Sequence, residues 1–367
     1  MSILSLQLTN FRGYVAKTFE FDEAGSTLVV GDNAVGKTNL IEALWMLARG
    51  KSFRAGHDRE MIAYGEEIAR VEGFLASQGV PLQGEGTPSQ DELEVVVTAG
   101  LVAGQKMPHK RYLVNGVSKR RMDFVGKLPA VLFRPEDMEL IAGSPHVRRE
   151  YLDSVLEQVD AEYRRSLLSY KKGLRQRNKL LERIRDGEAQ HSQLLFWDQL
   201  LIKNGDVIAQ KRQELIGFVN EAFGRDKISQ VFGGLEMVYD RSVVSEGRLQ
   251  QYAREEVAAG ITLVGPHRDN FLVIANKRDL SVYGSRGEQR LAILALKLAE
   301  LSFVTGKIGQ RPLLLLDDIF SELDHEHRED VLQVVGQQQT ILTTTDLHLV
   351  EPKYRRKMEL INLATNH

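Results

Sequence analysis

A glycine-rich loop near the start of the sequence has the composition of a phosphate-binding site. Gly31, Gly36, Lys37 and Thr38 follow the pattern Gly-x-x-x-x-Gly-Lys-Thr. Glycines at these positions let backbone N–H groups close around phosphates, the lysine neutralises phosphate charge, and the hydroxyl is a ligand for Mg²⁺. The pattern therefore predicts a nucleotide-phosphate site, formed by Gly31, Asp32, Asn33, Ala34, Val35, Gly36, Lys37, Thr38 and Asn39.

A pair of acids late in the sequence could complete this site. Four leucines at 313–316 precede Asp317 and Asp318. An acid at the end of a buried strand can hold Mg²⁺ through its water shell, so we predict that Asp317 and Thr38 are the metal-binding residues. Asp318 is the candidate general base for an attacking water, which makes Asp318, Asp317 and Lys37 the predicted catalytic set. The alternative is an Asp pair that only ends a strand and caps the next turn.

Hydrophobic patterns indicate the elements that must hold these groups. Residues 26–30 form a short β-rich run and the residues from 41 to Gly50 have helical character, so the glycine-rich loop lies between a strand and a helix N-terminus. The positive end of a helix dipole there favours an anion. Further patterns predict a hairpin from residue 4 to 21, strands near 260–274, 279–283, 311–318 and 340–344, and helices at 147–222, 288–301 and 325–335.

Composition limits the class of protein. The 367 residues include 48 Lys+Arg and 50 Asp+Glu, 43% are hydrophobic, and none is cysteine. This describes a folded chain of one large or two modest domains without disulfides or thiolate metal sites. We expect a cytoplasmic protein with no membrane-spanning segment. The net charge of −2 argues against coating nucleic acid through bulk charge.

One stretch departs from this balance. Between residues 164 and 185 there are nine basic residues and one acid, a net charge of +8, within a segment of helical periodicity. Such side chains can reach DNA phosphates without reading bases. A solvated helix face is an equally good interpretation. The predicted DNA contacts are Arg164, Arg165, Lys171, Lys172, Arg175, Arg177 and Lys179.

The distance between the two halves of the nucleotide site is itself informative. Lys37 and Asp317 are 280 residues apart, far more than one strand–helix–strand crossover needs. A large insertion must separate them, which argues against the classes of small kinases and GTPases. We expect an ATPase lobe formed by residues 1–125 and 300–367, with a mainly helical lobe at 126–299.

A third motif introduces a resemblance. Ser285, Gly287 and Gln289, at the start of a predicted helix, resemble the signature motif of ABC-type ATPases. The resemblance implies an α/β fold: an ABC-type P-loop ATPase head with an antiparallel β subdomain and an inserted mainly helical lobe. It also implies that this motif binds the γ-phosphate of ATP held by a second copy, so that ATP drives formation of a homodimer. Residues 321–324 resemble the D-loop, with Asp324 at the nucleotide interface.

A narrower resemblance covers residues 2 to about 350: the chain is similar to the RecF family of SMC-related bacterial repair ATPases. This implies binding of gapped or junction DNA, with single-stranded DNA as a further substrate, together with RecR and RecO partners, indirect help to RecA, and a part in replication and the SOS response. It also implies that Arg12 supports the nucleotide. The motifs are residues 8–12, 31–39, 51–54, 133–137, 143–149, 176–178, 265–269 and 313–324.

Departures from the wider family shape the remaining expectations. ABC-type ATPases carry Glu where Asp318 stands, and the shorter side chain predicts slow hydrolysis. Together with the resemblance, this leads us to expect a weak, DNA-dependent ATPase. Thr345 occupies the place of the transporter switch histidine, and residues 133–141 contain no glutamine for a Q-loop. These absences argue against the main alternative, the ATPase subunit of an ABC transporter. A purely structural SMC-type tether would need long heptad runs, which the insertion lacks; another SMC-like ATPase stays open.

Overall fold

The computed structural model describes residues 2–23, 25–76, 90–225 and 227–363, which form two compact units. Unit 1 comprises Met1–Asp137 and Val304–His367, and unit 2 comprises Met138–Phe303. The expected boundary after residue 125 is displaced, because the strand at Ala130–Phe133 pairs with the strand at Leu313–Asp317. The hydrogen bonds of that pairing place the whole segment up to Asp137 in unit 1.

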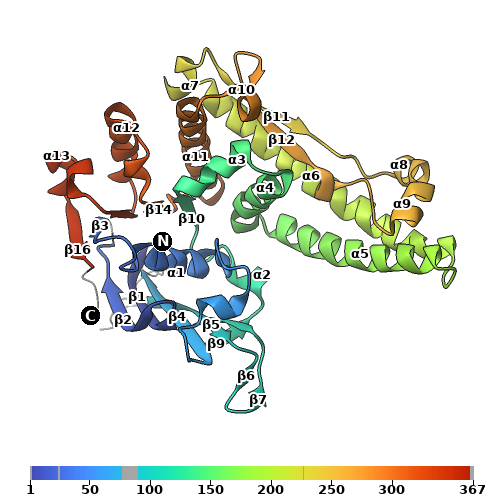
Figure 1. The fold of residues 1–367 in the computed structure, drawn as a ribbon, viewed down its shortest axis with the longest axis horizontal. Coiled ribbons are helices and arrows are strands. Elements are labelled where there is room, and N and C mark those ends of the chain that lie inside the picture. The colour runs from blue at the N-terminus through green and yellow to red at the C-terminus, as the bar shows by residue number, and fades with distance from the viewer. Residues whose placement is uncertain (1, 24, 77–89, 226, 364–367) are drawn as a thin grey trace, which may run out of the picture. The chain divides into compact units, whose positions relative to one another are not determined.

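Unit 1 is built on two large sheets, and β6 and β7 pair with each other in a separate two-stranded sheet (Figure 1). One has the strand order β2-β1-β4-β5-β8-β9 and is antiparallel throughout, whereas the other has the order β10-β14-β15-β3-β16 and is parallel. The strands are β1 (Ile3–Phe11), β2 (Tyr14–Glu20), β3 (Ser26–Val30), β4 (Ile68–Ala76), β5 (Gln90–Thr98), β6 (Leu101–Val102), β7 (Gln105–Lys106), β8 (Lys110–Val114), β9 (Val117–Lys119), β10 (Ala130–Phe133), β14 (Leu313–Asp317), β15 (Thr340–Thr344) and β16 (Met358–Asn362).

Helix α1 (Lys37–Arg49) occupies the core of unit 1. Its sequence is apolar on almost every face, and the helix contacts strands of both sheets, so that residues such as Leu44 and Leu47 are fully buried. Burial on this scale fixes the helix firmly and therefore fixes its N-terminus. The other helices of this unit are α2 (Arg121–Phe124), α12 (His325–Val335) and α13 (Pro352–Arg355).

Unit 2 is mainly helical and carries one small antiparallel sheet of order β11-β12-β13. The long helices α5 and α6 pack side by side (Figure 1). Its strands are β11 (Leu235–Asp240), β12 (Asn270–Ala275) and β13 (Arg278–Asp279). Its helices are α3 (Glu139–Ala142), α4 (Pro145–Val159), α5 (Ala161–Arg185), α6 (Leu195–Phe223), α7 (Lys227–Val231), α8 (Glu246–Gln251), α9 (Ala253–Ala259), α10 (Leu280–Tyr283) and α11 (Arg286–Ile308), the last of which continues into unit 1.

This architecture confirms the expected fold class and most of the expected elements, with two differences. The segment 279–283, predicted as a strand, is mostly helix α10, because Asp279 caps a helical turn by accepting a hydrogen bond from the N–H of Ser281. The strand expected from residue 260 begins only at Asn270. Within the described ranges, no helix is both long enough and apolar enough to cross a membrane.

Candidate functional site

The parallel sheet brings the predicted nucleotide residues to one edge. Strands β3, β15 and β14 are neighbours in register, with Val30 opposite Thr344 and Thr343 opposite Asp317. Their carboxyl ends therefore lie together, as in other open parallel sheets that bind ligands at this edge. The glycine-rich loop follows β3 and the acid pair follows β14, so two motifs 280 residues apart in the sequence meet in unit 1.

Two positions of the loop, Gly31 and Gly36, have no room for a side chain. Gly36 has a φ of 112°, and a Cβ there would lie 2.7 Å from the Tyr14 hydroxyl, which donates a hydrogen bond to the carbonyl oxygen of Gly36. A Cβ on Gly31 would lie 2.6 Å from the carbonyl oxygen of Leu363. Gly36 is followed directly by α1, whose start has no side-chain cap, so its first backbone N–H groups remain available to an anion.

Lys37 is folded over this loop. Its ammonium group donates hydrogen bonds of 2.7 Å to the carbonyl oxygens of both Gly31 and Asp32. Burial lowers the pKa of Lys37, and the carboxylates of Asp318, Asp317 and Asp32 oppose that shift. The cation thus lies where a bound phosphate would need it. Asp32, Asn33 and Ala34 form the exposed rim of the loop.

Asp317 and Thr38 are adjacent, as predicted for a metal site. Asp317 is 5% exposed, and its Oδ1 accepts hydrogen bonds from the hydroxyls of Thr38, at 3.3 Å, and Thr343, at 2.8 Å. Burial raises the pKa of Asp317, while these two hydrogen bonds lower it. A hydroxyl and a carboxylate at this separation provide the hard oxygen ligands that Mg²⁺ prefers.

Asp318 has an unusual conformation. Its φ is 51°, and its N–H donates to the Thr343 hydroxyl at 3.1 Å. Its Oδ1 is buried and has no hydrogen-bond partner among the described residues. Burial raises the pKa of Asp318, whereas Lys37 and the backbone of Thr345 lower it. An unpaired buried oxygen beside a phosphate loop is suited to accept a proton, so the residues present fit a Mg²⁺–nucleotide complex.

The signature-like residues gather at the start of α11 in unit 2. The N–H of Ser285 donates to Glu288 Oε2 at 2.7 Å, and the N–H of Glu288 donates to the Ser285 hydroxyl at 3.2 Å. This reciprocal pair is a capping box. Gln289 donates from Nε2 to the carbonyl of Leu280, and Gly287 leaves its surroundings open. One of the two amides predicted to bind phosphate, the Ser285 N–H, therefore already donates to the Glu288 carboxylate.

Asp324, predicted from the D-loop resemblance, lies in unit 1. It is the N-cap of α12, where its Oδ1 accepts a hydrogen bond from the N–H of His327 at 3.0 Å. The hydrogen bonds from His327 lower the pKa of Asp324. In this arrangement Asp324 fixes the first turn of a helix, and any contact with nucleotide at an interface stays a prediction.

Comparison with known families decides the ancestry of this arrangement. The model of the RecF/RecN/SMC N terminal domain matches residues 2–358. The chain belongs to this family. The RecF proteins of Herpetosiphon aurantiacus and Moorella thermoacetica, both called DNA replication and repair protein RecF, are 37% and 35% identical to it. The alignments cover 96% of each chain in the first case, and 99% of this chain and 95% of the relative in the second.

Solved structures agree with this membership. A structure of the recombination mediator protein RecF with ATP has a TM-score of 0.84 and 30% identity, and covers 95% of this chain and 93% of the other. A structure of an Smc head bound to the C-winged helix domain of ScpA, with a TM-score of 0.52, 16% identity and coverage of 95% and 91%, shares the fold alone. An ATPase head of the RecF and SMC type is thus the architecture of this chain.

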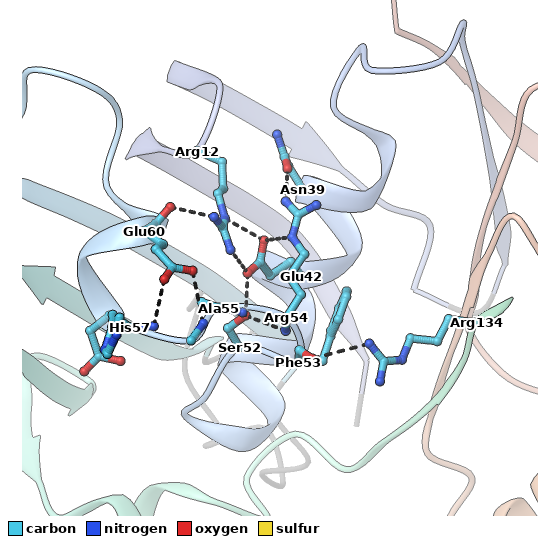
Figure 2. A network of polar contacts seen from close by, with 12 residues as sticks. Arg12, Asn39, Glu42, Ser52, Phe53, Arg54, Ala55, His57, Glu60 and Arg134 are labelled. Atoms are coloured by element: carbon cyan, nitrogen blue, oxygen red, sulfur yellow. Dashed lines mark hydrogen bonds and ion pairs between the residues drawn. The ribbon is translucent and has the colours of Figure 1, made fainter. Parts of the chain in front are cut away.

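Arg12, predicted to support the nucleotide, is held beside α1. It lies in the turn between β1 and β2 with a φ of 53°. Its guanidinium binds the carboxylate of Glu42 through Nε, at 2.9 Å, and Nη2, at 2.7 Å, and donates from Nη1 to the carbonyl of Glu60 (Figure 2). Its position therefore depends on Glu42, in the second turn of the phosphate-loop helix.

The basic residues of α5 divide into two groups. Arg165, Lys172, Arg175 and Lys179 are exposed. Residues seven apart on a helix share one side, so Arg165, Lys172 and Lys179 form a stripe with Arg175 close to it. Lys171 is exposed too, but it pairs with Asp153 at 3.0 Å, and the half-buried Arg164 donates to the carbonyl of Glu157.

The prediction for Arg177 as a DNA contact is wrong. Its side chain is 2% exposed and pairs with Asp198, at 2.6 Å, and Glu256, at 2.7 Å. Its Nη1 also donates to the Thr262 hydroxyl at 2.8 Å. A guanidinium enclosed by two carboxylates cannot reach a phosphate at the surface. The uniform run of charge in the sequence concealed this inward-facing position.

Three site residues escaped sequence reasoning. Thr343 bridges the acid pair, and Glu42 holds Arg12. The negative charge of Glu136, in the turn after β10, raises the pKa of Asp317, so this carboxylate lies near the metal site. A signal existed for Glu42, because a single acid within the apolar run 40–48 must find cationic partners when the helix is buried. Nothing in the local sequence singles out Thr343 among the adjacent threonines.

Proposed function

We propose that this protein is an ATP-dependent DNA-binding protein of recombinational repair that forms a homodimer around two ATP molecules. The observation that carries the proposal is the meeting of Lys37, Thr38 and Asp317 at one sheet edge, next to the unpaired carboxylate oxygen of Asp318. Membership of the RecF/RecN/SMC family, with relatives named for replication and repair, supports this interpretation over a transporter subunit.

Each residue of the site has a defined part in ATP hydrolysis. The N–H groups at the start of α1 and the ammonium of Lys37 bind the phosphates. Thr38 and Asp317 would hold Mg²⁺, which when bound neutralises phosphate charge. Asp318 accepts the proton of the attacking water as the water oxygen bonds to the γ-phosphorus and the β–γ phosphoanhydride bond breaks, which releases ADP. Its pKa, raised by burial, favours that role. Its short side chain makes hydrolysis weak, and DNA binding stimulates it.

Dimerisation follows from the incomplete binding of the γ-phosphate by one copy. The start of α11, with Ser285, Gly287 and Gln289, and the D-loop residue Asp324 complete the site of the partner copy. ATP then binds the closed dimer better than the separate chains, and loss of the γ-phosphate opens it. For a phosphate to bind at the start of α11, the Ser285 N–H must exchange its hydrogen bond to Glu288 for one to the phosphate.

The dimer binds DNA through the exposed stripe on α5. We infer that gapped or junction duplexes are its substrates, and single-stranded DNA a further one. With RecR-type and RecO-type partners it helps RecA to assemble, and so supports replication and the SOS response in the cytoplasm. The support is the family membership and a related structure described as part of the RecFOR pathway.

Light scattering with and without Mg²⁺–ATP tests the dimer. Asp318→Asn removes the proton acceptor but keeps the binding groups, so this variant should accumulate as a dimer with ATP and stay smaller without it. Lys37→Met, which lacks the phosphate-binding ammonium, should not respond to ATP. An Asp318→Asn chain that binds ATP yet never increases in mass at high concentration would refute the dimer. A Lys37→Met chain that dimerises like the wild type would refute the assignment of the loop.

A further inference from the structure

The first turns of α1 contain a polar network around one carboxylate. Glu42 is fully buried in a helix whose neighbouring residues are apolar. Its two oxygens accept hydrogen bonds from Arg12, from Nε of Arg54 at 2.8 Å, and from the hydroxyl of Ser52 (Figure 2). One negative charge thus serves two guanidinium groups.

The donors come from segments that are separate in the sequence. Arg12 belongs to the β1–β2 turn, and Arg54 to the loop after α1. Arg54 also donates from Nη2 to the side-chain oxygen of Asn39, the residue after the metal-binding candidate Thr38 (Figure 2). Glu42 therefore ties two loops to the helix whose N-terminus forms the phosphate site.

The charges in this network do not balance. Two arginines and one glutamate leave one positive charge, and the Arg12 side chain is 17% exposed. A guanidinium has five N–H groups. Three of those on Arg12, one each on Nε, Nη1 and Nη2, donate to the Glu42 carboxylate or to the carbonyl of Glu60. With respect to the residues that the structure describes, Arg12 therefore keeps N–H groups that can bind an anion.

A buried ion pair is weak evidence for a purely stabilising role, because desolvation offsets much of its attraction. An apolar residue at position 42 would pack well in this helix. Without the carboxylate, the two guanidinium groups would repel each other and leave their present positions. The contribution of Glu42 is therefore to fix the positions of the Arg12 and Arg54 guanidinium groups.

We propose that Glu42 is a positioning residue for nucleotide binding, which acts by holding the Arg12 guanidinium beside the first two turns of the phosphate-loop helix. The proposal rests on the proposed function, since it requires the loop to bind ATP. Glu42 does not contact the nucleotide itself. Its loss should weaken binding through Arg12 and should have no further effect once Arg12 is gone.

A double-mutant cycle tests this dependence. Affinity for a fluorescent ATP analogue with Mg²⁺ is measured for the wild type, Glu42→Gln, Arg12→Ala and the double variant. Glu42→Gln should weaken binding on the order of tenfold, the scale of a misplaced binding group. The double variant should bind like Arg12→Ala alone, because the two residues act as one unit.

Controls separate positioning from general destabilisation. Glu94, in β5, is also buried and paired with an arginine, Arg70. Glu94→Gln removes this ion pair far from the phosphate-loop helix in the sequence and should leave nucleotide affinity unchanged. Glu42→Asp keeps the charge and should restore most of the affinity. If Glu42→Gln does not fold, Glu42→Leu, which suits the apolar surroundings of this helix, takes its place in the cycle.

The outcomes are distinct. Unchanged affinity in a folded variant without the carboxylate, Glu42→Gln or Glu42→Leu, would overturn the positioning role, and so would effects of the two single variants that simply add. A wild-type chain that does not bind the analogue would instead refute the proposed function. Weaker binding in Glu94→Gln equal to that in Glu42→Gln would show that only stability had been measured, and would also overturn the proposal.

Discussion

Thr343 connects the two acids of the nucleotide site through a single hydroxyl group. The hydroxyl donates to Asp317 Oδ1 and accepts from the N–H of Asp318, and the residue is fully buried. A hydroxyl can do both at once. Thr343 therefore fixes the orientation of the metal-binding candidate and the backbone of the candidate base together.

Thr343→Val should lower ATP hydrolysis on the order of tenfold, as removal of an outer partner of a metal ligand does. The hydrogen bond that this variant removes is one that lowers the pKa of Asp317, so that pKa should rise. Because Mg²⁺ needs the ionised carboxylate, the acidic limb of Mg²⁺-dependent ATP binding should move to higher pH.

The pH profile of ATP binding checks this expectation, with Thr340→Val as the matched control. Thr340 is equally buried on β15, but its hydroxyl donates to the carbonyl oxygens of Val335 and Gln338 instead. A Thr343→Val profile identical to that of the control would contradict a role in orienting the acids.

Chemistry carried by local patterns was predictable from the sequence, and chemistry carried by tertiary contacts was not. The phosphate loop was predictable because its glycines, lysine and threonine lie close together in the sequence. Asp317 was predictable because it ends an apolar strand. Glu42 and Thr343 matter only because the fold brings Arg12 and the acid pair to them. Arg177 shows the converse: the sequence pattern placed its charge at the surface, but in the fold the side chain is buried between two carboxylates.

At the scale of elements, two helix starts differ in their readiness for phosphate. The start of α1 has no side-chain cap, whereas that of α11 is closed by Ser285 and Glu288. The Ser285 hydrogen bonds lower the pKa of Glu288, so its carboxylate stays charged at neutral pH. An anion that approaches α11 must therefore displace another anion.

Glu288→Gln should strengthen ATP-dependent dimerisation roughly threefold, because it removes a negative charge from a helix start proposed to meet the γ-phosphate. Scattering across protein concentrations with ATP measures this, and the gain should shrink in high salt. Glu246→Gln is the control, since Glu246 lies in the first turn of α8 behind the cap Ser245. Equal or weaker dimerisation in Glu288→Gln would argue against a phosphate at this helix.

The exposed stripe on α5 gives a second prediction at this scale. Charge reversal of Lys172, Arg175 and Lys179 should weaken DNA binding in ATP for all sequences alike, and should reduce the log–log salt slope by about one for each phosphate that is no longer neutralised. Filter or fluorescence titrations at several salt concentrations measure both quantities. The control is charge reversal of three exposed basic residues outside α5, Lys203, Arg225 and Arg254, which should have little effect on DNA binding. Equal weakening of DNA binding in both sets would contradict a specific role of the stripe.

Most elements followed from periodicity, and the exceptions have local causes. Strand β3, helix α12 and strand β15 lie where apolar spacing indicated them. The segment at 279–283 has a strand-like composition, yet the Asp279 cap begins a helical turn there. The order of the strands could not be derived from spacing, because β16 and β3 are distant in the sequence and pair only in the folded sheet.

At the scale of the whole molecule, unit 2 is held by a buried polar network. Arg212 binds both Asp153 and Asp269 at 2.8 Å, which joins α6 to α4 and to the loop before β12. Nearby, His267 lies between the Tyr170 hydroxyl, at 2.8 Å, and the carbonyl of Thr262, at 3.0 Å. Burial lowers the pKa of His267 to about 4.

His267 should make the protein less stable in mild acid. Its pKa is about 4 when folded against an ordinary 6.5, so the unfolded chain binds a proton first as the pH falls. Its contribution is intact above pH 6.5 and is lost as the pH falls toward 4, by roughly 2 kcal/mol between pH 7 and pH 5. Urea unfolding at these two pH values should show a smaller difference for His267→Gln than for the wild type. Exposed His191, changed to Gln, should leave the difference unaltered, and an unaltered difference in His267→Gln as well would contradict the prediction.

The interleaved parallel sheet has a consequence for synthesis of the chain. Strand β3 emerges early, but both of its neighbours, β15 and β16, follow the whole of unit 2 in the sequence and are translated after it. Unit 2, a continuous stretch, can fold while β3 is still unpaired at the ribosome. The apolar strand beside the phosphate loop is thus exposed to nascent-chain chaperones until β15 and β16 have been made, and slower elongation between unit 2 and these strands would prolong that exposure.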